Sequence, residues 1–407
     1  MSSYLKEAFD NCISADYKSA VLSAVSIAEK YNIKMYLIGG IVRDLILQKT
    51  VKDIDITLEY DAIEFCSLLK KEINCEITAL QENLRTAKVR FENNIEVDFA
   101  STREEYYIKS GALPSAYNFG CPLKSDVKRR DFTINTLALD LTQKCLLIDY
   151  FNGCEDIKNK KIKVLHSKSF IDDPSRIIRA LKFKERLDFT IEPYTYKLMQ
   201  EYLSNIDETI PLERIKNELR QYFSIQKDNL YENIIESKAY KLISDNPVLI
   251  YKKELLPLLK SYNLYEKNDV WFIYIALLIV NSDYKNARLN LNSYERNILN
   301  EIKSLLKMPS IDINNNFEIY NTYIDKTNLT LAVYFLITGE NSVQKFLEAL
   351  KQIRVLITGK DLIELGFIPS KYFSELFEKV LKEKLKGNLT TKEEEINFVK
   401  QFIKKAE

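Results

Sequence analysis

The sequence predicts an α+β protein in which a mixed front segment of helices and strands is followed by an all-helical remainder. Three observations support this fold class. Short runs that alternate between apolar and polar residues, and an apolar run that ends at Gly39-Gly40, lie within residues 1–145. From about residue 168 onward, apolar residues recur at helical spacing. The 407 residues include only 9 glycines and 9 prolines, and this scarcity of helix breakers favours long helices.

Composition narrows the classes of protein to which the chain can belong. The formal net charge is only +1, so a surface for nucleic acid would have to be a local basic patch. The six cysteines form no CxxC pair and His166 is the one histidine, which argues against zinc sites and Ser-His-Asp hydrolysis. Any chemistry must then be carried by carboxylates, arginines and lysines.

Targeting signals are absent from the sequence pattern. The first residues contain no apolar signal core, and the most apolar run, 270–280, is too short to cross a bilayer. We expect that run to form a buried helix. The expectation is a cytoplasmic protein with reduced, mostly buried thiols, no membrane contact and no evident protein partner.

The front segment begins with alternating helices and strands. In chain order, the patterns predict a helix over 1–30, a strand over 34–38, a turn at Gly39-Gly40, a helix over 41–49 and a strand over 53–59. The last strand alternates strictly between polar and apolar residues. This alternation places Asp53, Asp55 and Thr57 on one face, and the apolar residues between them face the core.

A hairpin and a loop region complete the front segment. Residues 86–91 and 95–100 alternate and flank a polar turn, which predicts a hairpin with Asp98 on the polar face of its second strand. Residues 101–127 are polar and contain two glycines and two prolines, so we expect a loop region. Residues 282–297 are a plausible linker between helical domains, although helices could continue through them.

The glycine turn and the alternating aspartates suggest phosphate and metal chemistry. Backbone N–H groups at a strand–Gly-Gly–helix turn can cradle phosphate oxygens, with Gly40 permitting close approach and Arg43 adding a guanidinium. Asp53 and Asp55 offer the hard oxygen ligands that suit Mg²⁺, so the pattern favours two-metal nucleotidyl transfer. The alternative is a solvated strand edge beside an ordinary turn. For Asp98, a third catalytic carboxylate and a solvent-facing strand residue are equally open.

Several stretches together resemble one enzyme family. Residues 39–57, GGIVRDLILQKTVKDIDIT, resemble motif A of the class II tRNA nucleotidyltransferase and bacterial poly(A) polymerase family, within the polymerase β superfamily. Similar motifs follow in order: motif B in RRDFTINTLALD (129–140), motif C in DYFNGCEDIKNKKIKVL (149–165), motif D in DDPSRIIRALKF (172–183) and motif E in PLERIKNEL (211–219). ITGKDLIELGF (357–367) is similar to a tail segment of many members.

The resemblance implies a polymerase-β-like nucleotidyltransferase head followed by an all-α neck, body and tail. The expected boundaries are 1–145 for the catalytic head, 146–205 for the neck with a nucleobase-reading helix, 206–280 for the body and 281–407 for a tRNA-binding tail. The resemblance implies the following nucleotide-binding residues: Gly40, Arg43, Arg130, Asp173, Arg176 and Arg179. Asp131, beside Arg130, also suits a helix cap.

Asp173 and Arg176 would select the incoming base. A carboxylate only accepts hydrogen bonds and a guanidinium only donates them. Cytosine and adenine present an acceptor beside an amino donor, whereas guanine and uracil present the reverse order. Each wrong pairing should therefore cost about 1–3 kcal/mol. The alternative is a row of surface ion pairs of little energetic value.

Two neighbouring features complete the site that the resemblance implies. Lys182 stands where the family usually has an arginine, and a lysine cannot form a bidentate fork. Glu213, Arg214 and Glu218 of motif E are expected to form ion pairs that support the base-selecting helix from behind.

The implied activity is template-independent addition of C and A to the 3′ end of tRNA, from CTP and ATP and with Mg²⁺. Alternatives within the family are an A-adding enzyme, a CC-adding enzyme and a poly(A) polymerase. A non-catalytic RNA-binding protein would have broken carboxylates, and a transferase for small molecules or proteins would lack the helical tail; neither describes this chain. The tail segment 371–405, rich in lysine and aromatic residues, suits either a solvated amphipathic helix or an RNA contact.

Overall fold

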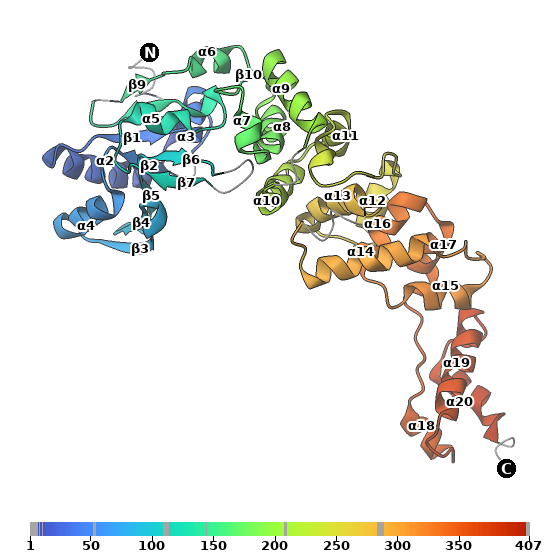
Figure 1. Cartoon of the computed structure of the whole chain (residues 1–407). Helices are drawn as coiled ribbons and strands as arrows, with labels where there is room; N and C mark the ends of the chain where they lie inside the picture. Colours follow the sequence, from blue (N-terminus) through green and yellow to red (C-terminus); the bar gives the residue numbers. More distant parts are fainter. Residues whose placement is uncertain are drawn as a thin grey trace. The chain divides into compact units, whose positions relative to one another are not determined.

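The computed structural model of the protein describes residues 7, 9, 11–51, 54–108, 114–143, 145–206, 210–282 and 289–403. Asp53, one of the two expected metal ligands, lies outside the described residues. The chain divides into two compact units, residues 1–242 and 243–407. Figure 1 shows a mixed sheet near the N-terminus and helices in the rest of the chain, so the expected α+β fold class is confirmed. The finer division into head, neck, body and tail stays a prediction.

A seven-stranded sheet organises the first unit. Its strands lie in the order β3-β4-β5-β2-β1-β8-β9. Their bounds are Met35–Ile38 (β1), Asp55–Leu58 (β2), Cys75–Gln81 (β3), Thr86–Phe91 (β4), Glu96–Ser101 (β5), Ala138–Asp140 (β8) and Leu146–Ile148 (β9). Strands β2 and β5 pair in parallel, and every other neighbouring pair is antiparallel. The predicted strands and the β4–β5 hairpin are therefore present.

Helices cover the apolar side of this sheet. Helix α2 (Ala15–Lys30) begins at Ser14, whose hydroxyl accepts from the Tyr17 N–H, and helix α4 (Ala62–Glu72) begins at Asp61. Helix α4 contacts β3, β4 and β5. Phe65 of α4 and Phe99 of β5 are fully buried, with ring centroids 5.6 Å apart. The short helix α3 (Gly40–Ile46) directly follows β1 and Gly39, as the sequence predicted.

Two sequence expectations for the front segment were wrong. Residues 101–127 are not a plain loop, because β6 (Glu104–Tyr106) pairs with β7 (Ser115–Tyr117) and helix α5 spans Leu123–Lys128. Asp131 suits a helix cap by sequence, which predicts a helix after it, but the chain forms only one 3₁₀ turn, Thr133–Asn135, before β8. In both places tertiary partners decide the structure: the Asp126 carboxylate accepts from the Arg103 N–H, and the Thr133 N–H donates to the Lys163 carbonyl.

The segment that follows the sheet, residues 149–165 and here called the connector, packs closely on that 3₁₀ turn. Helix α6 (Gly153–Lys158) begins at Gly153, whose N–H donates to the Asp149 carboxylate. A Cβ at Gly153 would overlap the Thr133 carbonyl oxygen, so only glycine fits there. Asp156, one turn further on, accepts a 2.6 Å hydrogen bond from the Thr133 hydroxyl.

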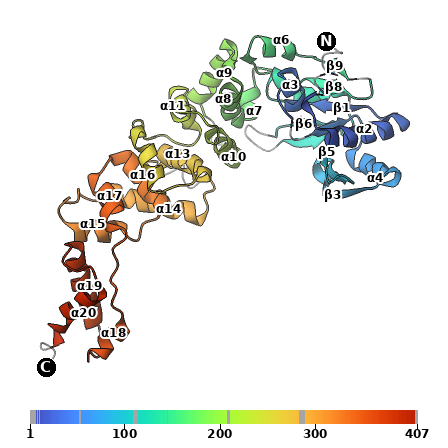
Figure 2. The ribbon, with the colours of Figure 1, turned by 180° about the vertical axis from the view of Figure 1, so that it is seen from behind.

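Helices complete the first unit. They are α7 (Ser169–Asp172), α8 (Ser175–Leu187), α9 (Pro193–Ser204), α10 (Leu212–Phe223) and α11 (Leu230–Glu236). A two-stranded parallel pair, β10 (Lys161–Ile162) with β11 (Thr190–Ile191), joins the connector to the end of α8. Helices α8 and α10 lie side by side, as Figures 1 and 2 both show. Pro174 is the N-cap residue of α8 and directly precedes its first turn.

The second unit is helical. Its main helices are α12 (Leu256–Ser261), α13 (Val270–Ile279), α14 (Ser293–Leu306), α15 (Asn316–Tyr323), α16 (Asn328–Thr338), α17 (Asn341–Lys345), α18 (Gly359–Glu364), α19 (Tyr372–Leu385) and α20 (Lys392–Lys400). The apolar run 270–280 forms a buried helix, as predicted. Where the chain is described, no helix combines the length and apolarity that crossing a membrane would require.

The C-terminal helices have a small core of their own. Leu362, Leu376, Val380 and Val399 are buried in one apolar cluster. Beside it, Lys384 forms an ion pair with Glu395, whose side chain is fully buried. The other oxygen of Glu395 accepts from the backbone N–H groups of 356 and 357, so this acid ties α20 to the segment before α18.

Candidate active site

Two carboxylates lie opposite each other on neighbouring strands. Asp55 of β2 and Asp98 of β5 are register partners in the parallel pair, so their side chains emerge from the same face of the sheet. Lys88 is the register partner of Asp98 on the next strand, β4, and its Nζ lies 3.2 Å from Asp98 Oδ2. These three side chains line a cavity of about 390 Å³, here called the carboxylate cavity.

The donor set at this cavity fits a magnesium ion. Asp55 is exposed and half of the Asp98 side chain is accessible, so oxygens of both acids can reach a ligand. Within the described residues, no three acidic, cysteine or histidine side chains gather into a metal site. One or two carboxylates completed by substrate phosphates are a usual magnesium arrangement, whereas zinc sites need more protein ligands. The metal roles of Asp53 and Asp55, and the catalytic role of Asp98, stay predictions.

The glycine turn brings the backbone close to an arginine. Gly39 has φ +80°, and a Cβ on it would lie 2.8 Å from Arg130 Nη1. Arg130 Nη2 donates to Asp126 Oδ2 at 3.2 Å, while its Nε is buried and has no hydrogen-bond partner among the described residues. Burial lowers the pKa of Arg130, and the Asp126 charge opposes that shift. A partly buried guanidinium with an unpaired, buried Nε–H favours an anionic ligand beside the turn.

Arg43 is less available than the sequence suggested. Its side chain is only 3% exposed; Nη1 donates to Asn135 Oδ1 at 2.6 Å and Nε donates to Asp44 Oδ1 at 2.9 Å. Its guanidinium also lies 5.0 Å from the centre of the Phe183 ring. Arg43 and Gly40 still line a second cavity, so both remain predicted nucleotide contacts.

This second cavity, here called the cationic cavity, has a volume of about 460 Å³. Eight cationic side chains and only three acidic ones line it, including Arg43, Arg129, Arg130, Arg176, Arg179 and Lys182. Arg129 and Arg130 also line the carboxylate cavity, so the two cavities adjoin. A strongly positive hollow beside exposed carboxylates suits a polyphosphate whose reacting phosphorus lies near the acids.

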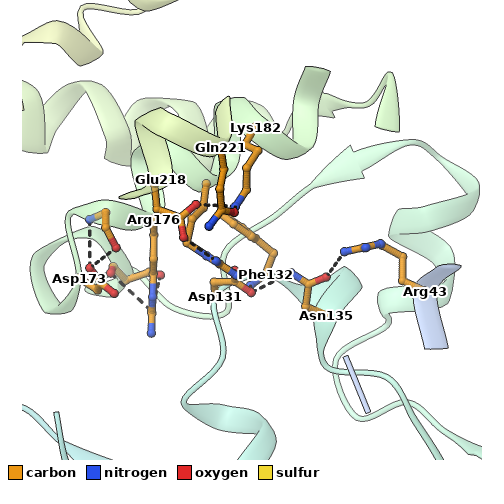
Figure 3. A network of polar contacts seen from close by, with 12 residues as sticks. Arg43, Asp131, Phe132, Asn135, Asp173, Arg176, Lys182, Glu218 and Gln221 are labelled. Carbon is orange, nitrogen blue, oxygen red and sulfur yellow. Dashed lines mark hydrogen bonds and ion pairs between the residues drawn. The ribbon is translucent and has the colours of Figure 1, made fainter. Parts of the chain in front are cut away.

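The base-selecting pair, Asp173 and Arg176, lies buried at the start of α8 and lines the cationic cavity. Asp173 Oδ1 accepts from the Ser175 N–H at 3.0 Å and from its hydroxyl at 2.6 Å. Asp173 Oδ2 accepts from Arg214 Nη1 at 2.8 Å. Arg176 donates to the Ser169 hydroxyl and the Arg129 carbonyl, each at 2.8 Å. Both side chains are therefore fixed by the protein, as Figure 3 shows.

A chain of charged contacts holds α8 against its neighbours (Figure 3). Asp131 accepts from Arg179 at 2.6 Å, and Arg179 also contacts Glu218 of α10 at 2.9 Å. Burial would lower the pKa of Arg179, but Asp131 and Glu218 together raise it. Lys182 contacts Glu218 at 2.5 Å and Gln221 at 2.7 Å. Lys182 therefore braces α8, and ion pairs of the expected kind are present for Arg214 and Glu218 of motif E, while the role of Glu213 stays a prediction.

Sequence reasoning missed the residues that bind the 101–127 segment to the site. Asp126 is fully buried and accepts from Arg129 and Arg130, three and four residues later. Glu105 accepts from Arg103 Nε and Arg129 Nη1, each at 2.9 Å. The spacing of Asp126 from the two arginines could have indicated the helix α5. Tyr107 also lines the cationic cavity, and no spacing or motif in the sequence indicated its position there.

Comparison with known proteins gives a consistent result. Residues 35–163 match the family model described as the poly A polymerase head domain. A CCA-adding enzyme of Staphylococcus epidermidis is 30% identical over 81% of this chain and 84% of its own length. An A-adding tRNA nucleotidyltransferase of Halalkalibacterium halodurans is 28% identical over 99% of this chain and 96% of its own length.

Solved structures share the fold. A Thermotoga maritima CCA-adding enzyme complexed with tRNA superposes with a TM-score of 0.76, covering 97% of both chains at 24% identity. The chain spans only 45% and 41% of the length of two other A-adding relatives, which are about twice as long.

Proposed function

This chain belongs to the class II tRNA nucleotidyltransferase family, and we propose that it adds C and A nucleotides to the 3′ end of tRNA from CTP and ATP. One observation carries the proposal. The base-selecting pair lines a cationic cavity that shares Arg129 and Arg130 with the cavity of Asp55 and Asp98. A nucleotide with its base at the pair and its phosphates along the shared arginines would present its α-phosphate to the carboxylates.

Base selection in this proposal depends on the fixed orientation of two side chains. Asp173 accepts a hydrogen bond from the amino group of cytosine or adenine, and Arg176 donates a hydrogen bond to the adjacent ring nitrogen. Three hydrogen bonds accepted by Asp173 and three donated by Arg176 hold both groups before the nucleotide arrives. Guanine and uracil would face like groups at both positions, and the pair is too tightly held to rearrange for them.

The transfer itself is a displacement at phosphorus. The 3′ hydroxyl of the tRNA attacks the α-phosphorus, a P–O bond forms, and the bond to pyrophosphate breaks. Magnesium held by Asp55 and Asp53 would lower the cost of ionising the hydroxyl and of releasing pyrophosphate. Arg130, beside the glycine turn, would carry part of the triphosphate charge, and Asp98 would orient the attacking end.

The helical second unit is proposed to hold the tRNA. Helix α19 carries its aromatic residues in its first half and its lysines in its second half, and Lys379 lies 4.6 Å from the centre of the Phe402 ring. Lys382 lies 4.5 Å from the centre of the Phe317 ring of α15. Such side chains can contact an RNA backbone and its bases.

A second candidate is addition of the final A alone. Its support is the H. halodurans relative, which is named an A-adding enzyme and matches nearly the whole chain. The base-selecting pair fits adenine as well as cytosine, so the pair alone does not decide between the two activities. Poly(A) synthesis, the third candidate, would use adenine only and would continue past one residue.

Three tRNA substrates separate these candidates. Purified protein is incubated with Mg²⁺, CTP, ATP or both, and tRNA that ends before CCA, after the first C, or after CC. CCA addition extends all three to a complete CCA end; A addition extends only the third, by one residue. Long adenine tails would indicate a poly(A) polymerase. Absence of any product, with tRNA still bound, would contradict the proposed transfer.

A further inference from the structure

Tyr107 lies on the wall of the cationic cavity and takes no part in the charged network around it. It directly follows strand β6 and its side chain is half-buried. Within the described part of the chain, the structure gives its ring no hydrogen bond and no ring contact. Burial raises the pKa of its hydroxyl, and the charges of Arg176 and Asp173 act on it as well. Tyr107 is therefore a neighbour of the base-selecting pair.

The other aromatic rings nearby are already engaged. Phe183 also lines the cationic cavity, but Arg43, Arg179 and Lys182 lie 5.0, 5.5 and 5.7 Å from its ring centre. Tyr106, the preceding residue, is absent from the cavity wall and packs against Tyr117 with ring centres 5.7 Å apart. Among the described wall residues, Tyr107 is thus the aromatic side chain whose ring makes no contact with another ring or with a cation.

The backbone at Tyr107 is held close to the base-selecting pair. Strand β6 pairs with β7, and Glu105, two residues before Tyr107, accepts from Arg129 Nη1 at 2.9 Å. The carbonyl of the same Arg129 accepts from Arg176 Nη2 at 2.8 Å. This short chain of contacts links the strand that precedes Tyr107 to the arginine that selects the base.

We infer that Tyr107 binds the incoming nucleotide by stacking its ring on the base that Asp173 and Arg176 select. The inference rests on the proposed function, because it takes that pair to be the base contact. Hydrogen bonds at one edge leave a base free to tilt, and an aromatic face fixes its plane. Stacking tolerates any base, so one ring serves cytosine and adenine alike while the pair supplies the discrimination.

Equilibrium binding of CTP, ATP, GTP and UTP to the full chain, with Mg²⁺ and without tRNA, tests this role. Tyr107→Ala is expected to weaken the binding of all four by a similar factor, roughly 5- to 100-fold, with the preference for C and A unchanged. Tyr107→Phe, which keeps the ring, is expected to bind as the wild type does. Tyr106→Ala is the matched control, since it removes the adjacent ring from the same strand.

Three outcomes would overturn the inference. Wild-type affinity in Tyr107→Ala would show that the ring does not contact the base. An equal loss in Tyr106→Ala would show that order in the β6–β7 pair, and not stacking, is responsible. A loss confined to one nucleotide would indicate a specific polar contact. Because the assay involves no transfer, failure of the proposed function would appear separately, as a wild-type protein that binds nucleotide and forms no product.

Discussion

Asp173 and Asp98 are both carboxylates of the candidate site, but the protein treats them differently. Asp173 is buried and accepts three hydrogen bonds, from the Ser175 backbone, the Ser175 hydroxyl and Arg214. Asp98 has half of its side chain exposed, and its ion pair is with Lys88, itself 38% exposed.

The difference matches two kinds of task. A group that discriminates between bases must keep one orientation, since a mobile carboxylate would adapt to the wrong partner. A group that binds a cation and an incoming RNA end must stay accessible and adjust its oxygens as ligands arrive. The comparison predicts that changes at the exposed acids act on rate, and that changes at the buried pair act on selection.

The largest effect is expected at the exposed acids. Asp55→Asn should slow nucleotide transfer on the order of 10³- to 10⁴-fold, because a metal ligand worth several kcal/mol in the transition state is lost. Gel assays of tRNA extension measure the rate, and filter binding should show unchanged tRNA affinity. Glu96→Gln, on the strand of Asp98, is the control and should keep full activity. Near-normal transfer by Asp55→Asn would contradict the metal assignment.

A second test compares how much the free energy of unfolding falls when a buried ion pair or an exposed ion pair loses one partner. Lys384→Met removes one partner of the ion pair with fully buried Glu395 and should lower the free energy of unfolding by about 3 kcal/mol. Lys382→Met, in the exposed pair with Glu378, should change it by less than about 1 kcal/mol. Denaturant unfolding of the two variants gives the comparison, and equal midpoints would refute it.

Selection should respond at the base-selecting pair. Arg176→Ala should reduce the preference for C and A over G and U by roughly 5- to 100-fold, since the donor beside the ring nitrogen is lost. Competition assays with mixed nucleotides measure this ratio. Arg186→Ala removes a charge from the same cavity and should weaken all four nucleotides equally. An unchanged ratio in Arg176→Ala would remove Arg176 from base selection.

The smallest effect is expected on the stability of the protein at low pH. Burial would raise the pKa of Asp126, but Arg130 and Arg129 outweigh it and lower that pKa. A lowered folded-state pKa stabilises the protein above the unfolded value of about 3.9, and this stability is lost as the pH falls through the folded value. Asp126→Asn should therefore flatten the fall of stability below about pH 4, by at most about 1.4 kcal/mol per pH unit. Urea unfolding at a series of pH values measures the free energy of unfolding, and the same dependence on pH in Asp126→Asn as in the wild type would contradict this assignment.

Local patterns predicted most of the elements that carry the site. Alternation indicated β2 and β5. The spacing of three residues along the sequence indicated one stripe at the start and along α8, and the four residues of that stripe line the cationic cavity: Asp173, Arg176, Arg179 and Lys182. The register of Asp55 with Asp98 could not be predicted, because β2 and β5 are far apart in the chain and their pairing depends on the whole sheet.

The errors have a common physical cause. The 101–127 segment was taken for a loop because its residues are polar, yet Glu105 and Asp126 find arginine partners that order it. The 3₁₀ turn at Thr133 replaces the expected helix because its backbone bonds to the connector and the next strand joins β1. In both cases tertiary hydrogen bonds decided a structure that local propensity left open.

The contact between Gly153 and the Thr133 carbonyl limits which residues position 153 can accept. The turn at Thr133 carries Asn135, and the connector that begins at Gly153 leads to α8, so the two meet at a point with no spare room. A single added methyl group would lie 2.4 Å from the Thr133 carbonyl oxygen, so the backbone of the turn or of the connector would have to move. Under the proposed function, we expect Gly153→Ala to slow nucleotide transfer more than it weakens nucleotide binding.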